Sequence, residues 1–345
     1  MGRRLHVHAR ALLLTLAVLL ASGSARATVS VQFNYDYATG TFVDDPAVRA
    51  VLDLAALQFT PLLDTLAEID PGSVPAPNSW SALIRQPTSG VDSFAIPDLF
   101  VADDTLIVFV GARDLGGTTA GEAAPGGASI AFTSNPTGSA WRDLVDARGE
   151  TGELDPMPSD FGPWGGWISF DTDTNWNLAA GLPAAGQVDF LSVAVHELGH
   201  VFGFGSAASW DEQINFGDGT FIGATAQGVH GAPVPLAPPD GAHWANSGLS
   251  PEPAMDPAIT TGTRKLLTPL DYAGLADIGW DVPLALLPEP GTGMLVTMAL
   301  VLLIGVASTR RSAPPPRAER PPPPGRAAAR RRGRRRSRGW APARG

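Results

Sequence analysis

The sequence of 345 residues contains no cysteine. Disulfide bonds, thiolate metal sites and cysteine nucleophiles are therefore excluded, and any zinc ion must be bound by histidine and carboxylate side chains. Histidine is also scarce, with six residues in the whole chain. Because two of these lie at the extreme N-terminus, the candidate metal ligands reduce to His196, His200, His230 and His243.

Basic residues are rare between the two ends of the chain. Thirteen of the 24 lysines and arginines follow residue 308 and four lie in the first 27 residues, which leaves seven against 33 acidic residues in between. Residues 28–308 thus carry a net charge near −26, although the net charge of the chain is −10. Such a surface favours solubility, argues against nucleic-acid binding by the folded part, and offers oxygen ligands to cations such as Ca²⁺.

Residues 1–27 have the pattern of a secretory signal peptide. Three arginines accompany an apolar run, Ala11–Ala21, and Ala25-Arg26-Ala27 supplies the small residues of a cleavage site. The apolar run is too short for a stable membrane anchor. We therefore expect export, with a mature chain that begins near Thr28; a buried N-terminal helix is the alternative interpretation.

The hydrophobic pattern of the body predicts a mixture of strands and helices. Strands are expected at residues 29–35, 105–110, 128–132 and 166–170. Helices are expected at residues 45–68, with a kink or break at Pro61, and at 141–147 and 190–201, the last capped by Asp189. This order indicates an α/β or α+β domain in which helix 190–201 packs on the sheet.

Two segments rich in proline, serine or glycine, 71–97 and 111–127, are predicted to be loops. Strand 166–170 directly precedes helix 190–201 in the predicted order of elements. We expect this strand at the edge of the sheet, where a peptide substrate can add as a further strand.

The functional interpretation depends on residues 193–206, VAVHELGHVFGFGS. His196 and His200 are four residues apart, so on a helix they share one face and can bind one Zn²⁺. Glu197 lies beside them and can take the proton of a zinc-bound water that attacks a carbonyl. Gly203 comes where the chain must turn away from the helix. The alternative is an ordinary surface helix, on which H-E-x-x-H also occurs by chance.

The motif from His196 to Gly203, H-E-L-G-H-x-x-G, resembles that of the metzincin metalloproteases. In that family a third histidine ligand commonly follows the glycine by three residues. Ser206 occupies this position here, and serine is a poor zinc ligand at neutral pH. Either the site has lost efficient zinc binding, or the third ligand comes from elsewhere in the chain.

A longer resemblance is to the leishmanolysin-type branch of the metzincins, in which an insertion precedes the third ligand. It covers about residues 160–281 and rests on Gly203-Phe204 and on four later segments: Gly241–Trp244, Ala254–Pro257, Leu267–Asp271 and Ala276–Trp280. It implies that His243 is the third zinc ligand and that Met255 forms a methionine turn beneath the metal. His243 as a surface-loop residue, with Trp244 as a core anchor, is the alternative.

The resemblance also implies the fold of residues 28–285. It is an α+β, metzincin-like zinc protease domain with a twisted sheet packed on the H-E-x-x-H helix, a methionine turn and a C-terminal helix. His230, within the insertion, is interpreted as a loop residue.

A second metal site is considered at Asp171, Asp173 and Asn175, which alternate like the oxygen ligands of a Ca²⁺ loop. The glycine and the distal glutamate of an EF-hand are missing. A solvated turn is therefore the favoured interpretation, with Ca²⁺ as a second candidate cofactor beside Zn²⁺.

Residues 286–311 resemble the PEP-CTERM sorting signal of Gram-negative bacteria. Pro288-Glu289-Pro290 is followed by an apolar stretch, 291–308, just long enough for one transmembrane helix, and by Arg310-Arg311. The resemblance implies recognition by an exosortase, transient anchoring in the inner membrane and a final place on the cell surface or outside the cell. A buried core helix is the alternative interpretation of the stretch. Residues 312–345, rich in proline and arginine, are expected to be disordered and extend beyond the usual end of such signals.

The sequence thus predicts an exported zinc endopeptidase that acts on protein or peptide substrates, with Glu197 as general base. The competing hypothesis is a non-catalytic surface or extracellular-matrix protein with a degenerate metzincin fold, and Ser206 is the residue that motivates it.

Overall fold

The computed structural model describes residues 28–40, 42–73, 77–149, 160–239, 241–245 and 249–287. These residues all belong to one compact unit. The expected signal peptide, the proline-glutamate-proline motif with its apolar stretch, and the arginine-rich tail lie outside the described residues, so the expected domain boundaries stay predictions. Within the described ranges, no helix has the length and apolar character needed to cross a membrane.

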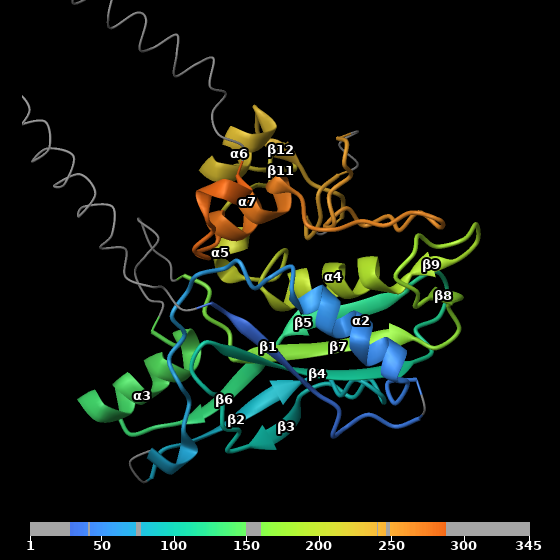
Figure 1. The fold of residues 1–345 in the computed structure, drawn as a ribbon. Coiled ribbons are helices and arrows are strands. Elements are labelled where there is room, and N and C mark those ends of the chain that lie inside the picture. The colour runs from blue at the N-terminus through green and yellow to red at the C-terminus, as the bar shows by residue number, and fades with distance from the viewer. Residues whose placement is uncertain are drawn as a thin grey trace, which may run out of the picture. The chain divides into compact units, whose positions relative to one another are not determined.

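Groups of strands are separated by helices along the described chain (Figure 1). The strands are β1 Ser30–Asn34, β2 Ser79–Ile84, β3 Phe94–Pro97, β4 Thr105–Arg113, β5 Gly121–Pro125, β6 Gly127–Ala131, β7 Gly165–Asp171, β8 Trp176–Asn177, β9 Val188–Asp189, β10 Ile214–Asn215, β11 Thr220–Phe221 and β12 Val234–Pro235. The α-helices are α2 Pro46–Ala56, α3 Pro136–Ala147, α4 Phe190–Val201, α5 Ala208–Asp211, α6 Ala224–His230 and α7 Pro269–Asp277, with 3₁₀ turns η1 Pro71–Ser73 and η2 Leu284–Leu286.

The central sheet has the order β1-β4-β7-β5, in which β5 is antiparallel and the other three strands are parallel. β4 is apolar at successive positions because both of its faces are covered. Leu106 and Val108 belong to one core, which also contains the apolar face of α4, whereas Ile107 and Phe109 belong to a second core. Figure 1 shows α2 and α4 together on the first face and the smaller sheet β3-β2-β6 on the other side.

The mixed α+β class was predicted correctly, and so were the positions of β1, β4, β6, β7 and α4, to within a few residues. Helix α3 was also predicted, but it begins five residues before the predicted start. The prediction for the first helix was too long, because α2 ends at Ala56 instead of Glu68. Tight turns follow, with Phe59 N donating to Ala56 O at 3.0 Å. Pro61 lies within the last of these turns, which the bond from Leu62 N to Phe59 O closes at 3.1 Å, so its missing N–H interrupts no helical hydrogen bond.

Both predicted loops contain strands. Segment 71–97 holds β2 and β3, and segment 111–127 holds the end of β4 together with β5. In β2 the side chains of Trp80, Ala82 and Ile84 are buried in alternation, a period of two that the surrounding proline, serine and glycine residues obscured. β5, with the sequence GEAAP, has no such pattern and forms because it pairs with β7.

The predicted edge position of β7 was wrong. β5 pairs along β7 from Gly121 to Pro125, so β7 is an inner strand, and β5 ends the strand order beside α4.

Candidate metal centre

Helix α4 holds the first two candidate ligands. Asp189 caps the helix, as predicted, and its carboxylate accepts from Ser192 N at 3.2 Å. His196 and His200 then face the same direction one turn apart, with their Nε2 atoms 3.2 Å from each other. The helix ends where expected, since Gly203 has a φ of +95° that a side-chain-bearing residue rarely adopts.

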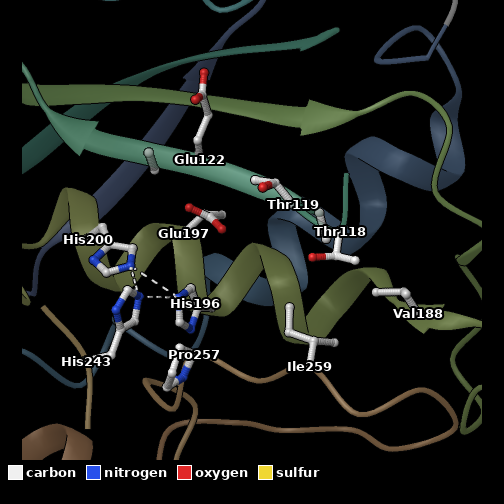
Figure 2. A pocket seen from close by; sticks show the side chains of 13 residues that line it. Thr118, Thr119, Glu122, Val188, His196, Glu197, His200, His243, Pro257 and Ile259 are labelled. Carbon is white, nitrogen blue, oxygen red and sulfur yellow. Dashed lines mark hydrogen bonds between the residues drawn. The ribbon is translucent and has the colours of Figure 1, made fainter. Parts of the chain in front are cut away.

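His243 returns from the insertion to complete a group of three imidazoles. Its Nε2 lies 3.0 Å from that of His200 and 3.2 Å from that of His196 (Figure 2). Zinc–nitrogen bonds of about 2.0–2.1 Å in a tetrahedral arrangement place neighbouring nitrogens about 3.3 Å apart. The separations in this structure therefore fit one shared ion, and this histidine group is the one cluster of metal-ligand type found among the described residues.

Two backbone carbonyls orient the helix imidazoles. His196 Nδ1 donates to Ala254 O and His200 Nδ1 donates to Phe204 O, both at 2.8 Å. A carbonyl can only accept, so the proton of each neutral ring is on Nδ1 and the lone pair of Nε2 points toward the centre. Burial, and then the neighbouring His200 and His243, lower the pKa of His196 well below 6.5, which favours the neutral ring that binds metals.

The other candidates lie elsewhere. Ser206 Oγ donates to His200 O at 2.8 Å, so this serine ends the helix instead of joining the imidazoles. His230 closes α6, and its Nδ1 lies 3.0 Å from Ala232 O. Neither residue belongs to the three-histidine group. The third imidazole of the group therefore comes from His243, which lies 37 positions after residue 206, where the metzincin motif has its third histidine.

A turn at residues 254–255 lies directly beneath α4. Met255 is fully buried, and a Cβ atom at position 199 would overlap its sulfur, so the contact requires glycine there. Ala254 supplies the carbonyl that orients His196. The buried carboxylate of Asp271 holds this turn in place, because it accepts hydrogen bonds from Ala254 N at 3.0 Å and from Met255 N at 3.2 Å.

Asp271 also connects the turn to the loop of the third histidine. Its carboxylate accepts from the indole of Trp244 at 3.1 Å and from Thr268 N at 2.7 Å, the latter within a capping box that begins α7. Trp244 is fully buried among aromatic rings, so it is a core anchor while the adjacent His243 joins the imidazole group. Sequence reasoning missed Asp271; the T-P-L-D pattern predicts the helix cap but not the link to residues 244 and 254.

Glu197 projects from α4 beside the imidazoles, toward strand β5 (Figure 2). Its side chain is 4% exposed, and burial, with the charge of Glu122 second, raises its pKa to about 8. The space for the carboxylate comes from Gly121, because a Cβ atom at that position would stand 2.6 Å from Glu197 Oε1. A carboxylate beside a three-imidazole group is suited to proton transfer at an adjacent reacting atom.

The imidazoles and Glu197 open into a cavity of about 450 Å³. It is lined by Thr118, Thr119, Ala120, Gly121, Glu122, Ala123, Val188, His196, Glu197, His200, His243, Pro257 and Ile259. One side is therefore β5 with the residues before it, and the other combines the first residue of β9, Val188, with the segment after Met255.

Comparison with known proteins links part of the chain to one family. The sequence profile of the matrixin peptidase family matches residues 130–212. Matrixins are metzincins, and the matched stretch contains the whole of α4 with His196, Glu197 and His200 but stops before His243. No curated protein matches the chain. The matrixin match supports a zinc metallopeptidase at this coarse level, whereas the leishmanolysin-type pattern and the sorting signal rest on the sequence resemblance alone.

Two further observations concern residues outside the three-histidine group. Asp171 accepts from Leu115 N at 3.0 Å, Asp173 N at 3.2 Å and Thr174 Oγ1 at 2.6 Å, the contacts of a turn, which favours the turn interpretation over a Ca²⁺ loop. Tyr272, the tyrosine that follows α4, donates to Gln58 O at 2.6 Å and lies outside the lining of the cavity.

Proposed function

We propose that this protein is an exported zinc-dependent endopeptidase. The observation that carries the proposal is the mutual separation of 3.0–3.2 Å among the Nε2 atoms of His196, His200 and His243, with the Glu197 carboxylate in the same cavity. The matrixin match over α4 supports the same reaction class.

The donor set fits zinc better than Ca²⁺ or Mg²⁺, because three neutral imidazoles suit zinc and the hard cations prefer oxygen. His196, His200 and His243 would hold the ion. A Zn²⁺ ion held there would supply Lewis-acid polarisation of a carbonyl and would lower the pKa of a water molecule. In its ionised form, which the positive charge of a bound ion would favour, Glu197 takes a proton from the attacking water and passes it to the leaving nitrogen of the peptide bond.

The substrate is a protein or peptide in extended conformation. β5 is the last strand in the order of the central sheet and borders the cavity, so its backbone is placed to pair with a substrate strand. Val188 and Ile259 add an apolar surface at one end of the cavity for a substrate side chain. This assigns to β5 the role that the sequence had suggested for β7.

Export and sorting belong to the same proposal on sequence grounds. The signal-peptide pattern of residues 1–27 supports export, and the resemblance of residues 286–311 to a PEP-CTERM signal supports processing by an exosortase-type machinery, with transient anchoring in the inner membrane and release to the outer envelope or beyond. N-terminal sequencing of the exported protein tests the first step, since a start far from Thr28 contradicts it.

Metal analysis and one substitution test the reaction class. The purified protein should contain one zinc per chain at neutral pH, and Glu197→Gln should keep the zinc while peptide cleavage falls by about 10²–10⁴-fold. Glu212→Gln, on the exposed side of the chain after α5, is the matched control and should cleave normally. Unchanged cleavage by Glu197→Gln would remove Glu197 from its role. Absence of stoichiometric zinc would instead favour the non-catalytic surface or matrix protein. That hypothesis was based on Ser206, and the position of His243 beside His200 weakens the argument for it.

A further inference from the structure

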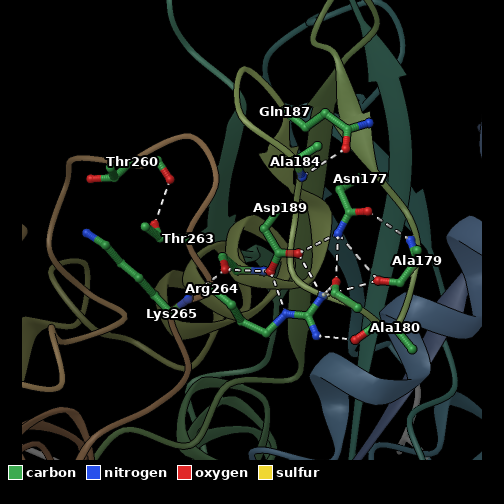
Figure 3. Close-up of polar contacts among 12 residues, drawn as sticks. Asn177, Ala179, Ala180, Ala184, Gln187, Asp189, Thr260, Thr263, Arg264 and Lys265 are labelled. Carbon is green, nitrogen blue, oxygen red and sulfur yellow. Dashed lines mark hydrogen bonds and ion pairs between the residues drawn. The ribbon is translucent and has the colours of Figure 1, made fainter.

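Arg264 binds five oxygen atoms from two other segments of the chain (Figure 3). Its Nε and Nη2 donate to the two carboxylate oxygens of Asp189 at 2.9 and 2.8 Å. The same guanidinium donates to three successive carbonyls: Ala179 O at 3.2 Å, Ala180 O at 2.7 Å and Gly181 O at 3.0 Å. This cluster, which we call the Arg264 clamp, joins the segment before α7 to loop 177–181 and to the start of α4.

The anchor point of the clamp, Asp189, is buried and has several other hydrogen bonds. Asp189 is fully buried and caps α4, where its carboxylate also accepts from Ser192 Oγ at 2.7 Å and Asn177 Nδ2 at 3.1 Å. The cap lies two turns before His196 on the same helix. Arg264 is therefore attached to the element that carries the imidazoles and Glu197, not to a loose surface loop.

Both sides of the clamp continue into the lining of the active-site cavity. Val188 immediately precedes Asp189, and Ile259 lies five residues before Arg264; both line the cavity, and Figure 2 shows them at the same end of it. Two further bonds join the same segments, Gly262 N to Gln187 O at 3.0 Å and Lys265 N to Ser192 Oγ at 2.8 Å. The end of the cavity is thus a seam between two segments that the clamp holds together.

We propose that Arg264 is a specificity-determining positioning residue: by holding segment 257–263 against the start of α4, it fixes the separation of Val188 and Ile259 and so selects the substrate side chain that fits between them. The proposal rests on the proposed peptidase function. A planar guanidinium can span both carboxylate oxygens and reach three carbonyls at once, whereas the ammonium of lysine is a point charge that can keep only part of this geometry.

The test is Arg264→Lys in the complete exported protein. Two pairs of fluorogenic peptides are used. The two peptides of a pair differ only in having leucine or tryptophan at one position, which precedes the scissile bond in the first pair and follows it in the second, and kcat and KM are measured for each peptide. At one of these positions the wild-type ratio of kcat/KM between the two peptides should change by about fivefold or more in the variant, mainly through KM, with one zinc per chain retained. A mere loss of folded protein lowers both values of kcat/KM equally and leaves the ratio unchanged.

Arg148→Lys is the matched control. Arg148 is also buried and donates to backbone carbonyls, among them Ala67 O at 2.7 Å and Ala102 O at 2.7 Å, but it does not line or border the cavity. It should lower stability without changing the ratio. If Arg264→Lys does not fold, Ser192→Ala opens the same seam more gently, and the ratio must shift at the same position.

An unchanged ratio in the folded Arg264→Lys or Ser192→Ala variant, or an equal change in Arg148→Lys, overturns the proposal. These outcomes leave the peptidase function intact. Failure of the wild-type zinc protein to cleave any peptide refutes the function itself, and with it the role of Arg264.

Discussion

Gly199 and Met255 are in such close contact that a Cβ atom at position 199 would overlap the methionine sulfur. The contact joins the middle of the zinc-motif helix to the turn whose Ala254 carbonyl orients His196. A glycine inside a helix weakens it by about 1 kcal/mol relative to alanine, so its presence here is explained by the space that Met255 requires.

Gly199→Ala should therefore destabilise the protein even though alanine favours helices. Overpacking at this contact is expected to cost about 1–3 kcal/mol in the free energy of unfolding, measured by urea denaturation of the metal-free protein. Zinc affinity should fall as well, because the turn that orients His196 must shift. Gly228→Ala in α6, where a Cβ atom meets nothing within 4 Å, is the control and should be neutral or slightly stabilising. Equal stability of the two variants would contradict the packing argument.

Gly121→Ala should reduce catalysis without removing the metal. The new Cβ would stand 2.6 Å from Glu197 Oε1, so the carboxylate must move while the three imidazoles stay in place. A displacement of this size is expected to lower kcat by about tenfold to a hundredfold. Gly127→Ala on β6 is the matched control, since its Cβ would meet only Leu83 Cβ at 3.7 Å. Zinc content and kcat are measured together, and an unaltered kcat in Gly121→Ala would show that the space at residue 121 is not needed.

His243→Ala should weaken zinc binding far more than His230→Ala. His243 Nε2 lies within 3.2 Å of both helix imidazoles, whereas His230 lies at the end of α6 outside the group. Loss of one of three protein ligands is expected to lower zinc affinity by at least about a hundredfold, since even the loss of a residue that orients a ligand costs 10–100-fold. Competition with a chromophoric chelator measures both variants. Similar affinities for the two would exclude His243 as a ligand.

The Asp189–Arg264 pair predicts a loss of stability in acid. Burial favours the neutral carboxyl, but hydrogen bonds from Arg264, Ser192 and Asn177 outweigh it and lower the pKa of Asp189 below 3.8. The folded protein therefore holds this proton less readily than the unfolded chain, so the stabilisation is complete above pH 3.8 and is lost as the pH falls through the lower, folded pKa. Urea denaturation across this range should show it, and Asp189→Asn should lack this part of the pH dependence. A pH profile identical in the two proteins would be inconsistent with the shift.

The local part of the candidate site was predictable from the sequence. The spacing of His196 and His200 places both on one helix face by geometry alone, and Asp189 and Gly203 mark the two ends of that helix through the backbone conformations they favour. The third histidine was within reach only through the resemblance, because a separation of 43 residues from His200 has no geometric consequence until the path of the insertion is known.

The sequence by itself determined a cysteine-free chain in which any zinc ion must be bound by histidine and carboxylate side chains, and a helix that presents two imidazoles and a carboxylate. These follow from residue types and from hydrogen bonding within a few residues. Only the tertiary structure decided that β5 borders the cavity, that Gly121 leaves room for Glu197, that Asp271 links Trp244 to Ala254, and that Arg264 joins the two segments that form the side of the cavity opposite β5. Each of these depends on contacts between segments far apart in the chain. Such contacts are set by how the whole core packs, and they cannot be inferred from the spacing of residues within a short stretch of sequence.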